Sequence, residues 1–131
     1  MEIVRRVFEA VARHDPEAVL AVYDRNVEYD FSGSPLRSFV GDRVYRGHDG
    51  IRKMIRDRHE AWEAVDDDCQ ELIDAGERVI SFVVSRARGR SSGIDTDLRH
   101  YGVWTIRKGK ITRVAWVHTR EEALEAAGLS E

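Results

Sequence analysis

The feature that most constrains the fold is a pair of strand-like segments that meet at the dipeptide Lys108-Gly109. β-Branched and aromatic residues cluster on both sides of this dipeptide, and a glycine at the joint favours a tight hairpin turn. We therefore expect a long β-hairpin at the centre of a sheet. A two-residue turn fixes one register, and its predicted pairs are Ile106 with Ile111, Trp104 with Arg113, Val103 with Val114, Tyr101 with Trp116 and Arg99 with His118.

The predicted register assigns each residue of the hairpin to one of two faces, because side chains alternate along a strand. The first face mixes aromatic rings with hydrogen-bonding groups, and we expect it to face the helices; its members are Arg99, Tyr101, Val103, Val114, Trp116 and His118. The second face is mostly apolar and would be an exposed patch on a monomer. We therefore expect a homodimer that forms through this outer face, which consists of His100, Gly102, Trp104, Ile106, Ile111 and Val117.

The first half of the chain has the apolar periodicity of helices. We expect one amphipathic helix over residues 2–14 and a second, shorter one from Pro16 to about Tyr23. Asp15 is suited to be the N-cap of the second helix, and proline is favoured as a first helical residue. A third helix is expected over residues 47–65.

The buried stripe of the third predicted helix contains a charged residue, Arg58, near the end that carries Trp62. A charged side chain in such a stripe either extends to solvent or points into something polar. The run Asp66-Asp67-Asp68 that follows is interpreted as a solvated turn. Strands are expected at residues 69–74 and 78–88, and the second should be covered on both faces because its apolar residues hardly alternate.

A further strand is expected at residues 27–31, and a short helix closes the chain. Thr119 and Glu122 have the spacing of a capping box at the start of that helix, and Gly128 supplies its C-terminal stop. Helices in the first half and strands mainly in the second predict an α+β domain, with helices on one face of a bent antiparallel sheet.

The composition is that of one globular domain over residues 1–131, with 42% hydrophobic residues to build a core. The net charge of −3 comes from 24 acidic and 21 basic residues, so the domain-wide positive charge of nucleic-acid-binding proteins is missing. No apolar run approaches the roughly 20 residues of a membrane helix, and the N-terminus lacks a signal-peptide pattern. We therefore expect a cytoplasmic protein with neither nucleic acid nor membrane as a partner. Cys69 is the only cysteine, which excludes an intramolecular disulfide.

Three segments carry a resemblance to a known family: the closing helix after Thr119, residues 45–52 (Tyr-Arg-Gly-His-Asp-Gly-Ile-Arg) and the Ser92-Gly93 turn. Together they resemble the SnoaL-like branch of the nuclear transport factor 2-like superfamily, over nearly the whole chain. The resemblance implies a cone in which three helices from the N-terminal half pack on a curved mixed or antiparallel sheet. It also implies a small-molecule site between the sheet and the helices, and dimers that form through the opposite sheet face.

Asp30 is the acid that the resemblance singles out, because residues 26–35 resemble the segment that carries the general-base aspartate of ketosteroid isomerases. The resemblance therefore implies a base inside an apolar cavity, where desolvation would raise its pKa. The alternative is an aspartate that caps the turn at residues 32–35 through the backbone. We expect the ligand-binding wall around Asp30 to consist of Tyr23, Arg58, Trp62, Arg99, Val103 and Trp116.

The chain departs from the resembling enzymes at two places. The oxyanion-hole positions of ketosteroid isomerases fall on Tyr101, which can donate a hydrogen bond, and on Val7, which cannot; Val7 therefore argues against steroid isomerase activity. Cyclases and limonene-epoxide-hydrolase-like enzymes have a carboxylate in the middle of the last strand, but residues 114–119 contain none. His118 is the candidate base or acid there, and Arg99 opposite would favour its neutral form.

The sequence thus predicts a protein that binds a small, largely apolar organic molecule in the cone. It could act as a cofactor-independent isomerase, cyclase or hydratase, with Asp30, His118 and Tyr101 as the catalytic residues. Two alternatives remain open: a ligand-binding protein without chemistry, and a dimerisation module whose cavity is filled by aromatic side chains. No metal-ligand spacing or phosphate-binding loop is present, so we expect no metal and no cofactor.

Overall fold

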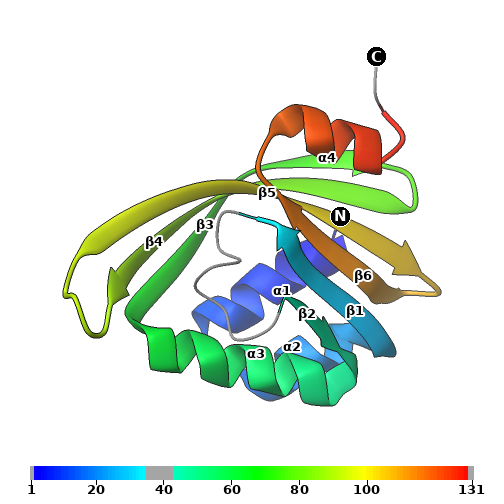
Figure 1. Cartoon of the computed structure of the whole chain (residues 1–131). Helices are drawn as coiled ribbons and strands as arrows, with labels where there is room; N and C mark the ends of the chain where they lie inside the picture. The colour runs from blue at the N-terminus through cyan, green and yellow to red at the C-terminus, as the bar shows by residue number, and fades with distance from the viewer. Residues whose placement is uncertain (1, 35–42, 130–131) are drawn as a thin grey trace.

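Four helices and a six-stranded sheet make up the computed structural model of the chain, which describes residues 2–34 and 43–129 (Figure 1). The strand order is β2-β1-β6-β5-β4-β3. β1 and β6 are parallel, and all other neighbouring strands are antiparallel. The predicted α+β architecture, with helices on a curved mixed sheet and a short C-terminal helix, is therefore confirmed.

The helices lie on both sides of the sheet (Figure 1). Three of them lie beneath its arch: α1 (Glu2–Ala12), α2 (Pro16–Val22) and α3 (Gly47–Ala61). The fourth, α4 (Arg120–Ala126), lies above it and begins with both hydrogen bonds of the expected capping box between Thr119 and Glu122. The described residues contain no helix that is long and apolar enough to span a membrane.

The sheet consists of long strands except at one edge. Its members are β1 (Tyr23–Gly33), β2 (Val44–Arg46), β3 (Trp62–Ala75), β4 (Arg78–Gly89), β5 (Asp95–Arg107) and β6 (Lys110–Val117).

The predicted solvated turn at Asp66-Asp67-Asp68 is wrong, because these residues lie in the middle of β3. Helix α3 ends at Ala61, four residues before the predicted end, and β3 begins at once. Each of the three aspartates pairs with a residue of β4, and the partner of Asp67 is Ser85. Aspartate has a low intrinsic preference for strands, so pairing with the long apolar strand β4 overrides the local signal.

The hairpin of β5 and β6 has the predicted two-residue turn, with Lys108 and Gly109 both at positive φ and Ile106 paired with Ile111. Beyond that pair the register shifts, and Thr105 lies opposite Arg113. Thr112 is therefore an extra residue on β6, which is the arrangement of a β-bulge. A one-residue shift moves side chains to the opposite face relative to their expected partners.

The bulge overturns the predicted faces of β5. Trp104 and Ile111 are 1% and 0% exposed and belong to the core beneath the sheet, and Ile106 is partly buried against the same core. Tyr101 and Val103 point to the other side, where they pack in the cluster that contains α4. The apolar outer patch predicted to form a homodimer is thus buried within the protomer and gives no support to dimerisation.

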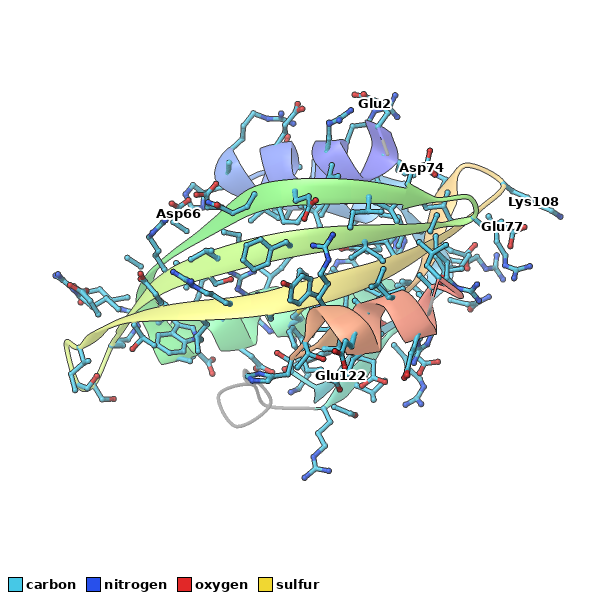
Figure 2. All side chains as sticks on the ribbon, turned by 90° about the horizontal axis from the view of Figure 1, so that it is seen from above. Glu2, Asp66, Asp74, Glu77, Lys108 and Glu122 are labelled. Atoms are coloured by element: carbon cyan, nitrogen blue, oxygen red, sulfur yellow. The ribbon has the colours of Figure 1, made fainter. Side chains whose placement is uncertain are left out.

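Two cores follow from this arrangement. The larger lies between the concave sheet face and α1, α2 and α3, and the smaller lies between the convex face and α4. Figure 2 shows α4, which carries Glu122, lying across only part of the outer face. The smaller core consists of Ile80, Val103, Ala123 and Ala127, with Ile73, Ala75, Tyr101, Val117 and Leu124 packed against it.

Candidate functional site

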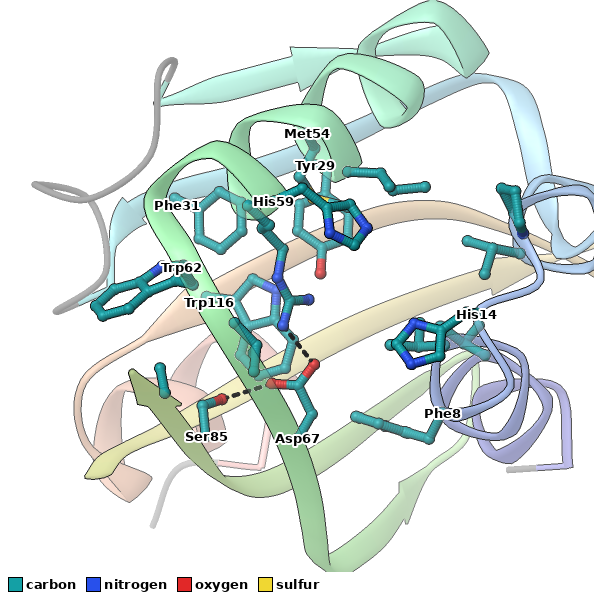
Figure 3. A pocket seen from close by; sticks show the side chains of 18 of the residues that line it. Phe8, His14, Tyr29, Phe31, Met54, His59, Trp62, Asp67, Ser85 and Trp116 are labelled. Atoms are coloured by element: carbon teal, nitrogen blue, oxygen red, sulfur yellow. Dashed lines mark hydrogen bonds and ion pairs between the residues drawn. The ribbon is translucent and has the colours of Figure 1, made fainter. Parts of the chain in front are cut away.

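A cavity of about 570 Å³ lies between the concave face of the sheet and the three helices beneath it (Figure 3). Such a volume is typical of small-molecule sites, which are mostly apolar with a few polar groups. All three tryptophans of the chain line this cavity. Its main apolar lining residues are Val7, Phe8, Val11, Val19, Tyr23, Tyr29, Phe31, Met54, Ile55, Trp62, Leu98, Trp104 and Trp116.

An ion pair lies in the wall of this apolar cavity. Arg58 projects from the inner stripe of α3, and its Nη2 donates a hydrogen bond to Oδ2 of Asp67 at 2.9 Å. Ser85, the β4 partner of Asp67, donates to Oδ1 of the same carboxylate at 2.8 Å (Figure 3). The side chains of Arg58 and Asp67 remain 27% and 15% exposed, so both can be reached from the cavity, which they line.

Both members of this pair are charged. Burial raises the pKa of Asp67, but the Arg58 guanidinium and the hydrogen bond from Ser85 lower it further, so the net shift is downward. Burial lowers the pKa of Arg58, and its attraction to Asp67 more than reverses this effect. An arginine and a carboxylate that are both ionised give the cavity adjacent hydrogen-bond donors and acceptors.

His100 extends the polar cluster. Its Nε2 lies 3.0 Å from Oγ of Ser85, whose single proton is donated to Asp67, so Nε2 must be the protonated nitrogen. Nδ1 is then a lone-pair acceptor, and it is buried with no hydrogen-bond partner among the described residues. Burial lowers the pKa of His100 to about 4, with Asp67 opposing and Arg58 adding to the shift. The imidazole is therefore neutral at pH 7.

Two indoles form the floor beside His100. The Trp116 ring stacks on the imidazole with centroids 4.3 Å apart and 23° between planes, and its Nε1 has no hydrogen-bond partner of normal geometry in the described chain. The Trp104 indole instead donates to Oγ of Ser81 at 2.8 Å. Gly102 makes room for both rings, because a Cβ there would lie 2.8 Å from Trp104 Nε1 and 3.0 Å from Trp116 Cζ3.

The sequence matches the family model of the SnoaL-like domain over residues 4–114. The chain belongs to the SnoaL-like domain family. Its resemblance to that family, on which the expected cone was based, is thus confirmed. No curated protein matches the sequence.

Solved structures share the SnoaL-like fold of this chain. An NTF2-like protein from Burkholderia thailandensis is 28% identical, with 98% of this chain and 94% of that chain covered and a TM-score of 0.79. An NTF2-like protein from Burkholderia pseudomallei is 24% identical over 95% and 94% of the two chains, with a TM-score of 0.80. A Mycobacterium tuberculosis protein in complex with estradiol-17beta-hemisuccinate is 16% identical over 90% and 92%, with a TM-score of 0.73.

The SnoaL-like cavity brings together four of the residues expected to bind ligand: Tyr23, Arg58, Trp62 and Trp116. The other two lie elsewhere. Val103 is buried beneath α4, and Arg99 is exposed on the convex face opposite Val84 of β4. Their predicted cavity position is wrong because the Thr112 bulge gives β5 the opposite orientation to that expected.

None of the three predicted catalytic residues is among the described residues that line the cavity. Tyr101 stacks on Phe82 on the convex face, with centroids 5.0 Å apart. His118 is exposed beyond the end of β6, and the predicted Arg99–His118 pair is wrong because of the register shift.

Asp30 has the geometry of the turn-capping alternative. Its Oδ1 accepts a hydrogen bond from the backbone N–H of Ser32 at 2.8 Å, and its Oδ2 accepts one from Arg113 at 3.2 Å. Residues 35–42 of the adjoining segment lie outside the described residues. Asp67 therefore lines the cavity, whereas Asp30 does not.

The polar residues missed from the sequence are Asp67, Ser85 and His100. Arg58 was the available signal, because a charged residue in a buried helical stripe needs a polar partner. Nothing in the sequence located that partner in an acidic run of low strand propensity. Among the described residues, no three His, Cys, Asp or Glu side chains form a possible metal-ligand group.

Proposed function

We propose that this SnoaL-like protein binds a small, largely apolar organic molecule in the cavity, with the polar end of the molecule against Arg58 and Asp67. The observation that carries this proposal is an ionised pair, still partly exposed, in the wall of an otherwise apolar cavity. A hollow interior favours ligand binding over the dimerisation module, which would need a packed one. The similar Mycobacterium tuberculosis protein in complex with estradiol-17beta-hemisuccinate supports the binding of a small organic molecule.

Methyl β-naphthyl ketone is a suitable first probe, because it joins two fused aromatic rings to one carbonyl group. Ring burial among the aromatic walls and a hydrogen bond from Arg58 predict a dissociation constant of about 10–100 µM for a ligand of this size. Binding should change the intrinsic fluorescence, since Trp62, Trp104 and Trp116 all line the cavity.

A matched pair of variants tests where the probe binds. Val65 lines the cavity, so Val65→Phe should reduce its volume and weaken binding about tenfold. Ile73 lies on the same strand but packs on the convex side, so Ile73→Phe should leave binding unchanged. Equal affinity in both variants would place the probe outside the cavity, and absence of binding to the wild type would refute the proposal.

A second candidate function is acid–base catalysis next to a carbonyl, favoured by the hydrogen-bonded chain from Asp67 through Ser85 to His100. In this proposal Arg58 donates to the carbonyl oxygen and stabilises the enolate, while Asp67 accepts the proton from the adjacent carbon. No cofactor is required. The neutral His100 and Ser85 hold the carboxylate in place.

Exchange of the methyl protons of the ketone for deuterium, followed by NMR, tests this second function. The wild type should exchange them faster than buffer, and Asp67→Asn should remove at least about 99% of the enhancement, because the amide cannot accept the proton. Tyr101→Phe on the convex face is the control and should retain full activity. Equal exchange with and without the protein would leave binding as the only function.

A further inference from the structure

The charges that line the cavity are unevenly distributed. Of the described lining residues, Arg58 is the one with a permanent positive charge, whereas Asp15, Glu63 and Asp67 are acidic. Arg58 lies 2.9 Å from Asp67, so its charge is already neutralised within the wall. The remaining ionisable lining residues are His14, His59, His100, Tyr23 and Tyr29.

A ligand carboxylate would therefore find no permanent cation in the described wall that is unpaired. It would lose its hydration on entering an apolar cavity, and repulsion by Asp67 would offset the attraction by Arg58. An uncharged carbonyl has a much smaller desolvation cost. Arg58 has five N–H donors and uses one of them on Asp67, so it can donate to a carbonyl oxygen while the ion pair stays intact.

We propose that Asp67 is a specificity-determining residue that makes the cavity select uncharged carbonyl compounds over the corresponding carboxylates. This inference rests on the ligand-binding function proposed above and adds the class of ligand. The selection comes from charge balance within the Arg58–Asp67 pair, and it does not depend on the shape of the apolar walls.

The pair can be unbalanced in either direction by a single substitution. Asp67→Asn keeps the shape of the side chain and leaves Arg58 as an unpaired cation, which a ligand carboxylate can pair with through two hydrogen bonds. Arg58→Gln leaves Asp67 as an unpaired anion, which favours an ammonium group. Tyr101→Phe is the control, because it alters a side chain on the convex face without changing a charge.

Three probes with the same ring system test the inference: methyl β-naphthyl ketone, β-naphthoate and β-naphthylmethylammonium. Each is titrated against the wild type, Asp67→Asn, Arg58→Gln and Tyr101→Phe at one pH, so that the histidines of the wall contribute equally throughout. The wild type and Tyr101→Phe should bind the ketone at least about tenfold more tightly than either ion. Relative to the ketone, naphthoate should gain about tenfold in Asp67→Asn and the ammonium about tenfold in Arg58→Gln.

The outcomes separate this inference from the function on which it rests. If all four proteins rank the probes alike, or if the wild type binds naphthoate as tightly as the ketone, the inference is overturned and ligand binding stands. If the wild type binds none of the probes, the proposed function fails and the inference fails with it. Because an unpaired buried charge destabilises a fold, melting temperatures are measured as well, and naphthoate should raise that of Asp67→Asn more than the ketone does.

Discussion

The two faces of β5 are similar in composition and opposite in role. His100 and Trp104 point into the concave side and form part of the cavity wall, whereas Tyr101 and Val103 point to the convex side. Both faces are rich in apolar and aromatic groups, so hydrophobicity alone does not tell which one surrounds the ligand site.

The two faces of β5 differ more in their packing contacts than in their composition. On the concave side, rings and hydrogen bonds fit around one another so closely that Gly102 has no room for a Cβ. On the convex side, Val103 fills a plain apolar core beneath α4, and Tyr101 stacks on the neighbouring ring of Phe82. The concave face therefore carries the polar groups and the shape of the site, while the convex face anchors the C-terminal helix.

Thr112 of β6 determines which face of β5 points into the cavity. Thr112 has no partner on β5, and the register beyond it differs by one from that set at the turn. The bulge lets Ile111, on the turn side, and Trp116, on the far side, both point into the concave core. A regular hairpin would direct them to opposite faces, because five positions separate them.

Insertion of one alanine between Thr105 and Ile106 should break this comparison and have the largest effect. The inserted residue would pair with Thr112 and remove the bulge; with the turn intact, Trp116 would then point to the convex side and Val117 to the cavity, so the cavity loses the stack of Trp116 on His100. We expect a loss of more than about 5 kcal/mol in the free energy of unfolding, comparable to the whole stability of many domains. Thermal unfolding followed by near-ultraviolet circular dichroism of the tryptophans measures it.

Thr112→Ala is the control for that insertion, because it keeps the bulge and the chain length. The Thr112 hydroxyl makes only a long hydrogen bond of 3.4 Å to the backbone carbonyl of Thr105. Its removal should cost less than about 1 kcal/mol. An insertion variant that melts like the wild type, with unchanged tryptophan signals, would show that the bulge does not set the faces.

Much of the fold could be predicted because its local signals are strong. The capping residues Asp15 and Thr119 mark the starts of two helices, and both accept the expected backbone hydrogen bond. Lys108-Gly109 specifies the turn through two positive φ angles. Each of these signals acts over a few residues, so the sequence contains the whole cause.

The site was harder to predict because its causes are not local. Asp67 lies in a strand because β3 pairs with β4. His100 of β5 lies in the cavity because the neighbouring strand β6 carries a bulge. Asp30 had an attractive sequence context, but its carboxylate is used by the turn at Ser32. A one-residue change in register reverses every face assignment, whereas it hardly changes the fold.

His100 and His118 extend the same comparison to pH. His100 is buried on the concave side of β5, while His118 is exposed beyond β6. Burial lowers the pKa of His100 from 6.5 to about 4, although Asp67 opposes that shift, and Arg58 reinforces it. Between these two values the unfolded chain binds a proton at this residue that the folded chain does not.

The contribution of neutral His100 is fully present above the unfolded pKa, is lost as the pH falls toward the folded pKa, and levels off below about pH 4. Between about pH 7.5 and pH 5 we expect the free energy of unfolding to fall by about 2 kcal/mol from this residue. Urea unfolding at a series of pH values measures the slope.

Matched substitutions assign that slope to the concave face. His100→Gln should remove about 2 kcal/mol of the decrease between about pH 7.5 and pH 5, because an amide has no proton to gain in this range. His118→Gln removes an imidazole from the exterior and should leave the decrease in place. If His100→Gln and the wild type lose stability equally as the pH falls, the imidazole gains its proton as readily in the folded protein as in the unfolded chain. The hydrogen-bonded chain through Ser85 would then have to include a charged His100.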